Sequence, residues 1–385
     1  MTELGRTLMI FDGGMGSELV KTGIACPVPE DLNVTHPNVI RKIHESYADA
    51  GADFITTNTF GLNRLKYKGE YDIPSVAKAA IANARATGKQ VFFDIGPTGK
   101  LLRPLGTVDF DEAYEAFREV VLASRDLVDG YILETFSDLY ELKAAVLAVK
   151  ESCDKPVFAT MTFDKTGRTL TGTTPEIMVA FLEEMGVDAV GVNCSLGPKE
   201  LSGVVRRILA CAHTPVIVQP NRGLPRLENG VSVYDLTVEE FAESAEEFAK
   251  MGVSVLGGCC GTSPLFIGSI AKFKGQKVKM QSHPRTTQIA SYAALTKVTD
   301  DTVYATLAVS GDTSEDECED LAYEVLDMAD EGAEVVCIEA NGISPKTLRT
   351  LIEKMQQMTS VPLRLKSGDE DLQACFGRYY IGTVK

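Results

Sequence analysis

Ser254-Val255-Leu256-Gly257-Gly258-Cys259-Cys260-Gly261 joins a short apolar run to two adjacent cysteines set among glycines. The apolar run predicts a buried strand that ends at the glycines. Two neighbouring thiolates can each supply one soft ligand to a zinc ion, and the glycines leave room around them. The stretch therefore predicts two ligands of a metal site, and a third ligand must come from another part of the chain.

Seven similar apolar or β-branched runs precede this stretch, and amphipathic segments of helical period separate them. The predicted strands span residues 8–11, 54–57, 91–94, 131–134, 157–162, 189–193, 216–219 and 254–258. The predicted helices span residues 38–50, 75–87, 110–127, 139–150, 176–185, 199–210 and 238–251. Eight strands that alternate with helices are typical of an α/β fold of the (β/α)₈ or TIM barrel type, and an open doubly wound sheet is the alternative.

The barrel interpretation brings the unusual polar residues of the chain together. In such barrels the active site lies at the carboxyl ends of the strands and in the loops that follow them. The candidate residues at these ends are Asp12, Gly13, Gly14, Asn58, Glu134, Cys194, Asn221, Cys259 and Cys260. We therefore expect them to converge on one rim.

Cys194 is the expected third zinc ligand because it directly follows the sixth strand. Three thiolates with one exchangeable position are the pattern of a catalytic zinc site rather than a closed structural one. The alternative is that Cys194 is a small buried apolar residue, as free cysteines commonly are. The other six cysteines have no comparable setting, and we expect them to be structural.

Asp12, Gly13, Gly14 and Glu134 have the chemistry to hold an amino acid. Exposed amides in a Gly-Gly turn before a helix suit a carboxylate, and the two acidic side chains suit an ammonium group. The alternative is a tight turn in which Asp12 caps the following helix. Asn58 and Asn221 end strands on the same rim, where they either position substrate or form turns.

Composition limits the class of partner. The formal net charge of −16 argues against nucleic acid or an anionic membrane, because both favour basic surfaces. No apolar run reaches the roughly 18 residues that a membrane helix needs, and the N-terminus lacks a secretory apolar segment, so we expect a cytoplasmic protein. An odd number of cysteines, nine, fits reduced thiols.

The acidic charge is concentrated in the last hundred residues, where 18 Asp and Glu stand against 8 Lys and Arg. Residues 276–287 are polar and predict a linker, which divides the chain into a barrel domain (1–285) and a small α/β domain (286–385). In the second domain we expect strands at 302–309, 334–339, 362–365 and 380–384, with helices at 315–331 and 345–358 and a short helix before the last strand.

Residues 8 to about 275 resemble the zinc-dependent homocysteine S-methyltransferases, a family that includes the N-terminal module of cobalamin-dependent methionine synthase. The motifs that carry the resemblance are Phe11-Asp12-Gly13-Gly14-Met15-Gly16, Thr57-Asn58-Thr59-Phe60, Leu133-Glu134-Thr135-Phe136, Asn193-Cys194-Ser195, Pro220-Asn221 and Gly257-Gly258-Cys259-Cys260-Gly261-Thr262. The resemblance implies a (β/α)₈ barrel with zinc on the three cysteines. It also implies homocysteine held near Asp12, Gly13, Gly14 and Glu134, with Asn221 beside the metal.

The domain after residue 286 is similar, more distantly, to part of the pterin-binding barrel that follows this module in methionine synthase. The similar segments are Gly332-Ala333-Glu334-Val335-Val336-Cys337-Ile338 and Val361-Pro362-Leu363-Arg364-Leu365-Lys366-Ser367. The family's aspartates are not matched in these strands, so folate binding is not implied. The chain also has no D-x-H-x-x-G loop for a corrinoid, so any cobalamin must be supplied by another protein.

The function expected from the resemblance is methyl transfer to homocysteine, giving methionine, with a methylated corrinoid on a separate protein as donor. Free donors such as S-methylmethionine, a betaine or methylfolate are the enzymatic alternative. A non-catalytic zinc-containing subunit of a methyl-transfer complex is the alternative from another class.

Overall fold

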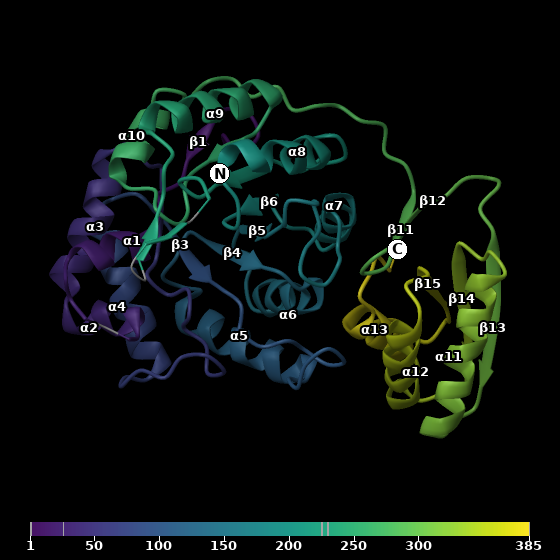
Figure 1. The fold of residues 1–385 in the computed structure, drawn as a ribbon. Coiled ribbons are helices and arrows are strands. Elements are labelled where there is room, and N and C mark those ends of the chain that lie inside the picture. The colour runs from purple at the N-terminus through teal and green to yellow at the C-terminus, as the bar shows by residue number, and fades with distance from the viewer. Residues whose placement is uncertain (1, 26, 225, 229–230, 385) are drawn as a thin grey trace.

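Eight parallel strands form one sheet in the order β1-β10-β7-β6-β5-β4-β3-β2 in the computed structural model, which describes residues 2–25, 27–224, 226–228 and 231–384. A bridge between Phe11 and Phe54 joins the two edges, so the sheet curls into a nearly closed barrel ringed by helices (Figure 1). Neighbouring strands follow one another along the chain, which confirms the (β/α)₈ barrel and excludes the open doubly wound sheet.

The eight barrel strands and the seven predicted helices of the barrel agree with the sequence-based prediction to within three residues, whereas the helices at residues 29–35 and 264–271 were not predicted. The barrel strands are β1 (Met9–Ile10), β2 (Phe54–Thr56), β3 (Gln90–Ile95), β4 (Gly130–Phe136), β5 (Val157–Met161), β6 (Ala189–Asn193), β7 (Val216–Gln219) and β10 (Val255–Leu256). The helices are α1 (Met15–Lys21), α2 (Leu32–Thr35), α3 (Pro37–Asp49), α4 (Ile73–Arg85), α5 (Phe110–Ser124), α6 (Leu139–Lys150), α7 (Pro175–Glu184), α8 (Pro198–Leu209), α9 (Val238–Met251) and α10 (Pro264–Ala271), with a 3₁₀ helix η1 (Pro29–Asp31). A short hairpin, β8 (Arg226–Glu228) and β9 (Val231–Val233), was not predicted.

Local sequence explains where these helices begin. Asp109 and Asp138 accept hydrogen bonds from the first-turn amides of α5 and α6, which satisfies donors that have no partner within the helix. Proline occupies the first turn of α3, α7, α8 and α10, where its missing N–H group is not needed. None of the described helices is both long and apolar enough to span a lipid bilayer.

An apolar layer fills the barrel interior. Its members, one from each strand or strand end, are Phe11, Phe54, Phe92, Ile132, Phe158, Ala189, Ile217 and Val255. The rings of Phe11 and Phe54 lie 4.8 Å apart, and so do those of Phe92 and Phe158. Because this layer packs the interior, a binding site has room only at the carboxyl ends of the strands.

The C-terminal region forms a smaller α/β unit beside the barrel (Figure 1). Its parallel sheet has the order β13 (Tyr304–Ser310), β14 (Val335–Asn341), β15 (Leu363–Lys366), and its helices are α11 (Glu315–Asp330), α12 (Pro345–Met358) and α13 (Glu370–Tyr379). These elements enclose an apolar core of their own.

The strand predicted at residues 380–384 is wrong. After α13 the chain makes a single bridge, between Gly382 and Ser291, and Thr383 N donates to Ala290 O. The Tyr380 ring is fully buried and stacks on Phe376, so the apolar pattern reflects a buried segment against the hairpin rather than a sheet strand.

The predicted linker is hydrogen-bonded to the barrel. Lys277 pairs with Thr7, and Val278 N donates to Arg6 O over 2.9 Å. A hairpin follows, formed by β11 (Gln288–Ala290) and β12 (Leu295–Lys297), and Ala290 packs into the barrel's core. The boundary between the two domains at residues 285 and 286 stays a prediction.

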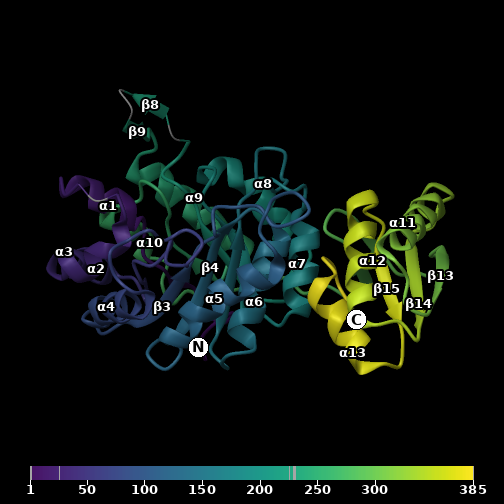
Figure 2. The same cartoon turned by 90° about the horizontal axis from the view of Figure 1, so that it is seen from below.

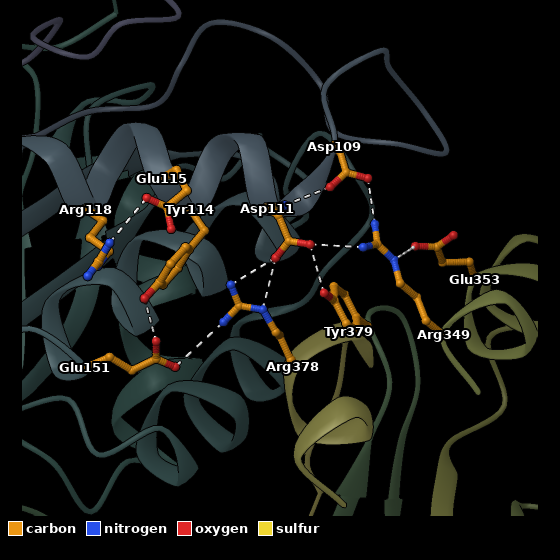
Figure 3. Close-up of polar contacts among 10 residues, drawn as sticks. All are labelled: Asp109, Asp111, Tyr114, Glu115, Arg118, Glu151, Arg349, Glu353, Arg378 and Tyr379. Atoms are coloured by element: carbon orange, nitrogen blue, oxygen red, sulfur yellow. Dashed lines mark hydrogen bonds and ion pairs between the residues drawn. The ribbon is translucent and has the colours of Figure 1, made fainter. Parts of the chain in front are cut away.

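The junction between the two parts is polar and centres on Asp111 of α5 (Figure 3). Its carboxylate accepts hydrogen bonds from Arg378 Nε (3.0 Å), Arg349 Nη1 (3.0 Å) and the Tyr379 hydroxyl (2.8 Å). Asp109 accepts a further bond from Arg349 Nη2 over 2.6 Å. One helix end of the barrel thus holds two helices of the C-terminal unit.

Replacing Asp111 by Asn should loosen this junction, because charge-assisted bonds to two arginines are lost, at about 1 to 3 kcal/mol. Hydrogen exchange measured by mass spectrometry should become faster in α12 and α13 and stay unchanged in β4 and β5. Glu115→Gln is the matched control, since Glu115 on the same helix pairs with Arg118 of α5. Equal exchange in both variants would contradict the assignment.

Candidate metal and substrate site

Cys194, Cys259 and Cys260 meet at the carboxyl ends of β6 and β10. Their sulfur atoms all lie within 4.8 Å of one another, and the Sγ atoms of Cys194 and Cys260 are 3.9 Å apart. Tetrahedral zinc with bonds of about 2.3 Å needs sulfur atoms separated by about 3.8 Å. The three residues therefore fit a zinc ion, and the structure brings the third cysteine to the other two as the sequence predicts.

The backbone at the third cysteine is strained. Cys194 and Ser195 have φ values of 59° and 57°, in the left-handed region that residues with side chains seldom adopt. Cys194 N donates to Gln219 O over 3.0 Å, and Leu196 N donates to Cys194 O over 2.7 Å. Such strain persists where the surroundings fix it, and it concentrates at functional sites.

The glycines around the cysteines make room for protein atoms. A Cβ at Gly258 would lie 2.2 Å from Thr262 Oγ1, and one at Gly14 would lie 2.6 Å from Cys259 O. Thr262 Oγ1 in turn donates to Cys259 O over 2.6 Å. The glycines thus permit the close packing of two strand-end loops that holds the cysteines in place.

The three thiols cannot all ionise without a cation. Hydrogen bonds from Cys194 and Cys259 lower the pKa of Cys260 to about 3. Its two thiol neighbours, with burial, hold the pKa of Cys259 well above its ordinary value. One negative charge is stable in this cluster and a second is opposed, so a bound cation is what would allow all three sulfur atoms to act as thiolates.

The other described cysteines lie outside this cluster. Cys318, Cys337 and Cys375 are buried in the C-terminal unit, and Cys153 and Cys211 are partly buried in the barrel. Cys26, which we also expect to be structural, lies outside the described residues.

Asn193 is a residue of this site that the sequence analysis did not single out. It is fully buried, and its Nδ2 atom lies 3.2 Å from Glu134 Oε2 and 3.9 Å from Cys259 Sγ. Its Oδ1 atom accepts hydrogen bonds of 2.8 Å from Thr160 Oγ1 and Thr135 N. Asn193 therefore links the cysteine cluster to the acidic side of the site. Its position directly before Cys194, at an inward-facing strand end, was the available signal.

Glu134 lies near the carboxyl end of β4, is partly buried, and accepts a hydrogen bond from Asn193 Nδ2 over 3.2 Å. Burial, followed by the charges of Cys194 and Asp12, raises its pKa to about 8. A buried carboxyl without a positive partner favours its neutral form, so a cation placed beside it would be bound strongly.

Asp12 joins the first two strands. Its Oδ2 accepts from Thr56 N (2.8 Å) and its Oδ1 accepts from Thr56 Oγ1 (2.7 Å). Burial raises its pKa to about 7, and the bonds from Thr56 partly oppose that shift. The Gly14 amide donates to Thr262 O over 3.1 Å. Binding of substrate by Asp12, Gly13 and Gly14 stays a prediction.

The two predicted asparagines have different surroundings. Asn221 Oδ1 accepts from Cys260 N over 3.1 Å, so this side chain orients a metal-ligand candidate. Asn58 Nδ2 donates to Pro29 O over 2.8 Å, and the backbone carbonyl of Asn58 accepts from Asn33 Nδ2. These two bonds hold η1 beside the rim. Their contact with substrate stays a prediction.

Tyr234 is a further neighbour of the cysteines that the sequence did not indicate. A Cβ at Gly261 would lie 2.8 Å from its ring. Burial, followed by the charge of Cys260, raises its pKa to about 12. It follows the unpredicted β8–β9 hairpin, which projects beyond the barrel (Figure 2).

Comparisons with known proteins identify a family for the barrel. A family model described as homocysteine S-methyltransferase matches residues 9–273. Methionine synthase from Mycobacterium tuberculosis is 35% identical over 294 residues, which is 70% of this chain and 25% of that protein. Methionine synthase from Mycobacterium leprae is 36% identical over 295 residues, 70% of this chain and 24% of that protein. The chain therefore spans about a quarter of the length of these curated relatives.

A solved structure shares the fold. The homocysteine methyltransferase MmuM from Escherichia coli, in its metallated form, matches with a TM-score of 0.60 and 20% identity, covering 69% of this chain and 96% of that chain. At this identity the match supports the barrel architecture alone.

Asp12→Asn should change how stability depends on pH. The folded protein keeps the Asp12 proton up to about pH 7, whereas the unfolded chain releases it near its ordinary pKa of 3.8. Between these two pKa values the folded state binds more protons than the unfolded state, so the contribution of Asp12 to the free energy of unfolding falls as pH rises. One pKa unit corresponds to about 1.4 kcal/mol, so the stability of the Asn variant relative to wild type should rise by roughly 2 to 4 kcal/mol between pH 4 and pH 8.

Urea unfolding of the metal-free proteins across this range measures the effect. Asp126→Asn is the control, because the Asp126 side chain is 89% exposed. Parallel stability curves for wild type and Asp12→Asn would contradict the prediction.

Proposed function

The chain belongs to the homocysteine S-methyltransferase family, and we propose that it transfers a methyl group to the sulfur of homocysteine, giving methionine, at a zinc ion held by Cys194, Cys259 and Cys260. The observation that carries this proposal is the cluster of three thiols with zinc-compatible spacing at the barrel rim, joined through Asn193 to Glu134. Three protein ligands leave the fourth position of a tetrahedral ion for the substrate sulfur.

The chemistry requires a thiolate at neutral pH. A free thiol has a pKa near 8.5 and is largely protonated. Zinc, when bound, lowers the pKa of a coordinating thiol so that the homocysteine sulfur is held deprotonated. The sulfur supplies the electron pair of the new S–CH₃ bond as the donor–CH₃ bond breaks, and the donor keeps the electron pair of the broken bond.

The residues of this chain would orient the substrate around that sulfur. Glu134 faces the barrel interior and favours the ammonium group of homocysteine. The charge of Asp12 acts on Glu134, and we place the carboxylate of homocysteine at the Gly13-Gly14 turn before α1, where the Gly14 amide would exchange its present bond to Thr262 O. Asn221 holds the backbone of Cys260, and Asn58 shapes the rim next to η1.

We favour a methylated corrinoid on a separate protein as the methyl donor. The support is that the relatives, 35% and 36% identical to this chain, are named methionine synthase. S-methylmethionine, a betaine and methylfolate are the free donors to compare. A zinc-containing subunit without turnover is the remaining alternative.

A donor screen tests the activity. Zinc-loaded protein is mixed with homocysteine and, in turn, methylcobalamin, S-methylmethionine, betaine and methylfolate, and methionine is measured by mass spectrometry. We expect methionine with methylcobalamin at a rate above that of the protein-free mixture. Failure with every donor would favour the non-catalytic subunit.

Cys259→Ala tests the metal site. Removing one of three ligands should lower the zinc content from one ion per chain to near zero and abolish turnover, while circular dichroism still shows a folded barrel. Cys153→Ala is the control, because Cys153 is a free cysteine outside the cluster. Stoichiometric zinc in the Cys259 variant would refute the three-cysteine site.

A further inference from the structure

Asp94 is a buried carboxyl at the carboxyl end of β3 that the proposed site does not yet include. Phe92, two residues earlier, belongs to the apolar layer of the barrel interior, so the alternation of a strand points Asp94 to the same side. Asp94 pairs in register with Ile132, another member of that layer, and Glu134 follows Ile132 on the same face. The two carboxyls therefore rise from adjacent strands, directly above the apolar layer.

One oxygen of Asp94 has no hydrogen-bond partner among the described residues. The side chain is 5% exposed, and Oδ1 is buried. The backbone is fixed on both sides, since Asp94 N donates to Thr57 Oγ1 (3.0 Å) and Thr59 Oγ1 donates to Asp94 O (2.8 Å). A buried polar atom without a partner lowers stability and is uncommon in folded proteins, so this oxygen points to a ligand.

The charges around Asp94 are predominantly negative. Burial, followed by the charges of Glu134, Asp12 and Glu30, raises its pKa well above the ordinary value. Lys66 opposes this effect, but its ammonium group lies over the Phe60 ring, 4.4 Å from the centroid. Among the residues that the structure describes, no ion pair neutralises the carboxyl of Asp94 or that of Glu134.

We propose that Asp94 is a substrate-binding residue that, together with Glu134, binds the α-ammonium group of homocysteine. This inference rests on the proposed function. An ammonium group supplies both the hydrogen-bond donors and the positive charge that the two carboxyls lack. A water molecule would supply donors without the charge.

A metal ion fits these carboxyls less well. Calcium takes six to eight oxygen ligands, and magnesium takes a near-octahedral set. Within the described part of the chain, groups of three or more acidic, cysteine or histidine ligands that lie close enough to share an ion are limited to the three cysteines. Two carboxyls on neighbouring strands are instead sufficient for one ammonium group.

The distance between Glu134 and the cysteines suits the length of the substrate. Asn193 spans the distance between Glu134 and Cys259, with contacts of 3.2 Å and 3.9 Å from its Nδ2 atom. Three carbon atoms separate the nitrogen of homocysteine from its sulfur. The molecule is therefore long enough to span from Glu134 to the cysteine cluster, and Asp94 would make the site selective for thiols that carry an amino group.

Isothermal titration calorimetry on the zinc-loaded protein tests this selectivity with two thiols, homocysteine and 4-mercaptobutanoate, which lacks the amino group. Asp94→Asn removes the charge with little change of shape. Loss of one charge-assisted hydrogen bond should weaken homocysteine binding roughly 10- to 100-fold. Binding of 4-mercaptobutanoate and the zinc content should stay unchanged, and the loss should appear in KM rather than in kcat.

Asp138→Asn is the matched control. Asp138 is also a buried aspartate of the barrel, but it caps α6 by accepting from Tyr140 N over 2.9 Å, a role that Asn can fill. This variant should bind both thiols as wild type does.

Two results would overturn the inference. One is an unchanged preference for homocysteine in Asp94→Asn, and the other is an equal loss of both thiols, which would mean a structural role. If the wild-type protein binds homocysteine with this selectivity but forms no methionine, the proposed methyl transfer is wrong and the proposed role of Asp94 is still supported. Wild-type protein that binds no homocysteine would refute both.

Discussion

The site depends on the hydrogen bonds by which Asp12 holds Thr56. They lie where the first and second strands meet, next to the bridge between Phe11 and Phe54 that brings the sheet edges together. Beyond this point Asp12 O accepts from Gly258 N, and Gly14 N donates to Thr262 O, so the closing strand is bonded to the cysteine loop. The contacts that close the barrel therefore also fix the backbone around Cys259 and Cys260. Burial raises the pKa of Asp12 to about 7. The residue that joins these strands therefore also adds a further acidic group beside the proposed site.

The acidic groups above the apolar layer are close enough to disfavour one another's ionised forms. Three thiols lie within reach of one ion, and Asp94 and Glu134 lie on adjacent strands, where burial, followed by neighbouring negative charges, raises the pKa of each carboxyl. Asn193 separates the two groups and contacts both. Unpaired buried acidic groups lower the stability of the folded protein. In the proposed function, a metal ion at the cysteines and an ammonium group at the carboxyls would remove this cost, so a molecule that carries both a thiol and an amino group would bind better than one with either group alone.

Periodicity predicted the barrel because each strand is an apolar run and each helix an amphipathic one, and a parallel barrel then places every strand end on one rim. Cys194 could be matched to Cys259 and Cys260 in this way, although the residues are far apart in the chain. Asn193 and Asp94 were missed because a polar residue at the end of an apolar run looks like any turn residue. Their importance comes from contacts across the interior, which depend on strand register. The strand predicted at residues 380–384 failed for the opposite reason, since an apolar segment buried against a hairpin has the composition of a strand.

The same packing determines how a methyl donor reaches the sulfur. The phenylalanine-rich layer fills the barrel below the pocket, so the donor must approach from the carboxyl ends of the strands. The C-terminal unit lies beside the barrel and is held through Asp111 of α5 and Lys143 of α6, which donates to Tyr380 O, both on the outer ring of helices (Figures 1 and 3). Tyr234 borders the cysteines at the base of a projecting hairpin. In the proposed reaction, a donor that enters at the carboxyl ends of the strands would approach the cysteines close to Tyr234, whether the donor is free or carried on a protein.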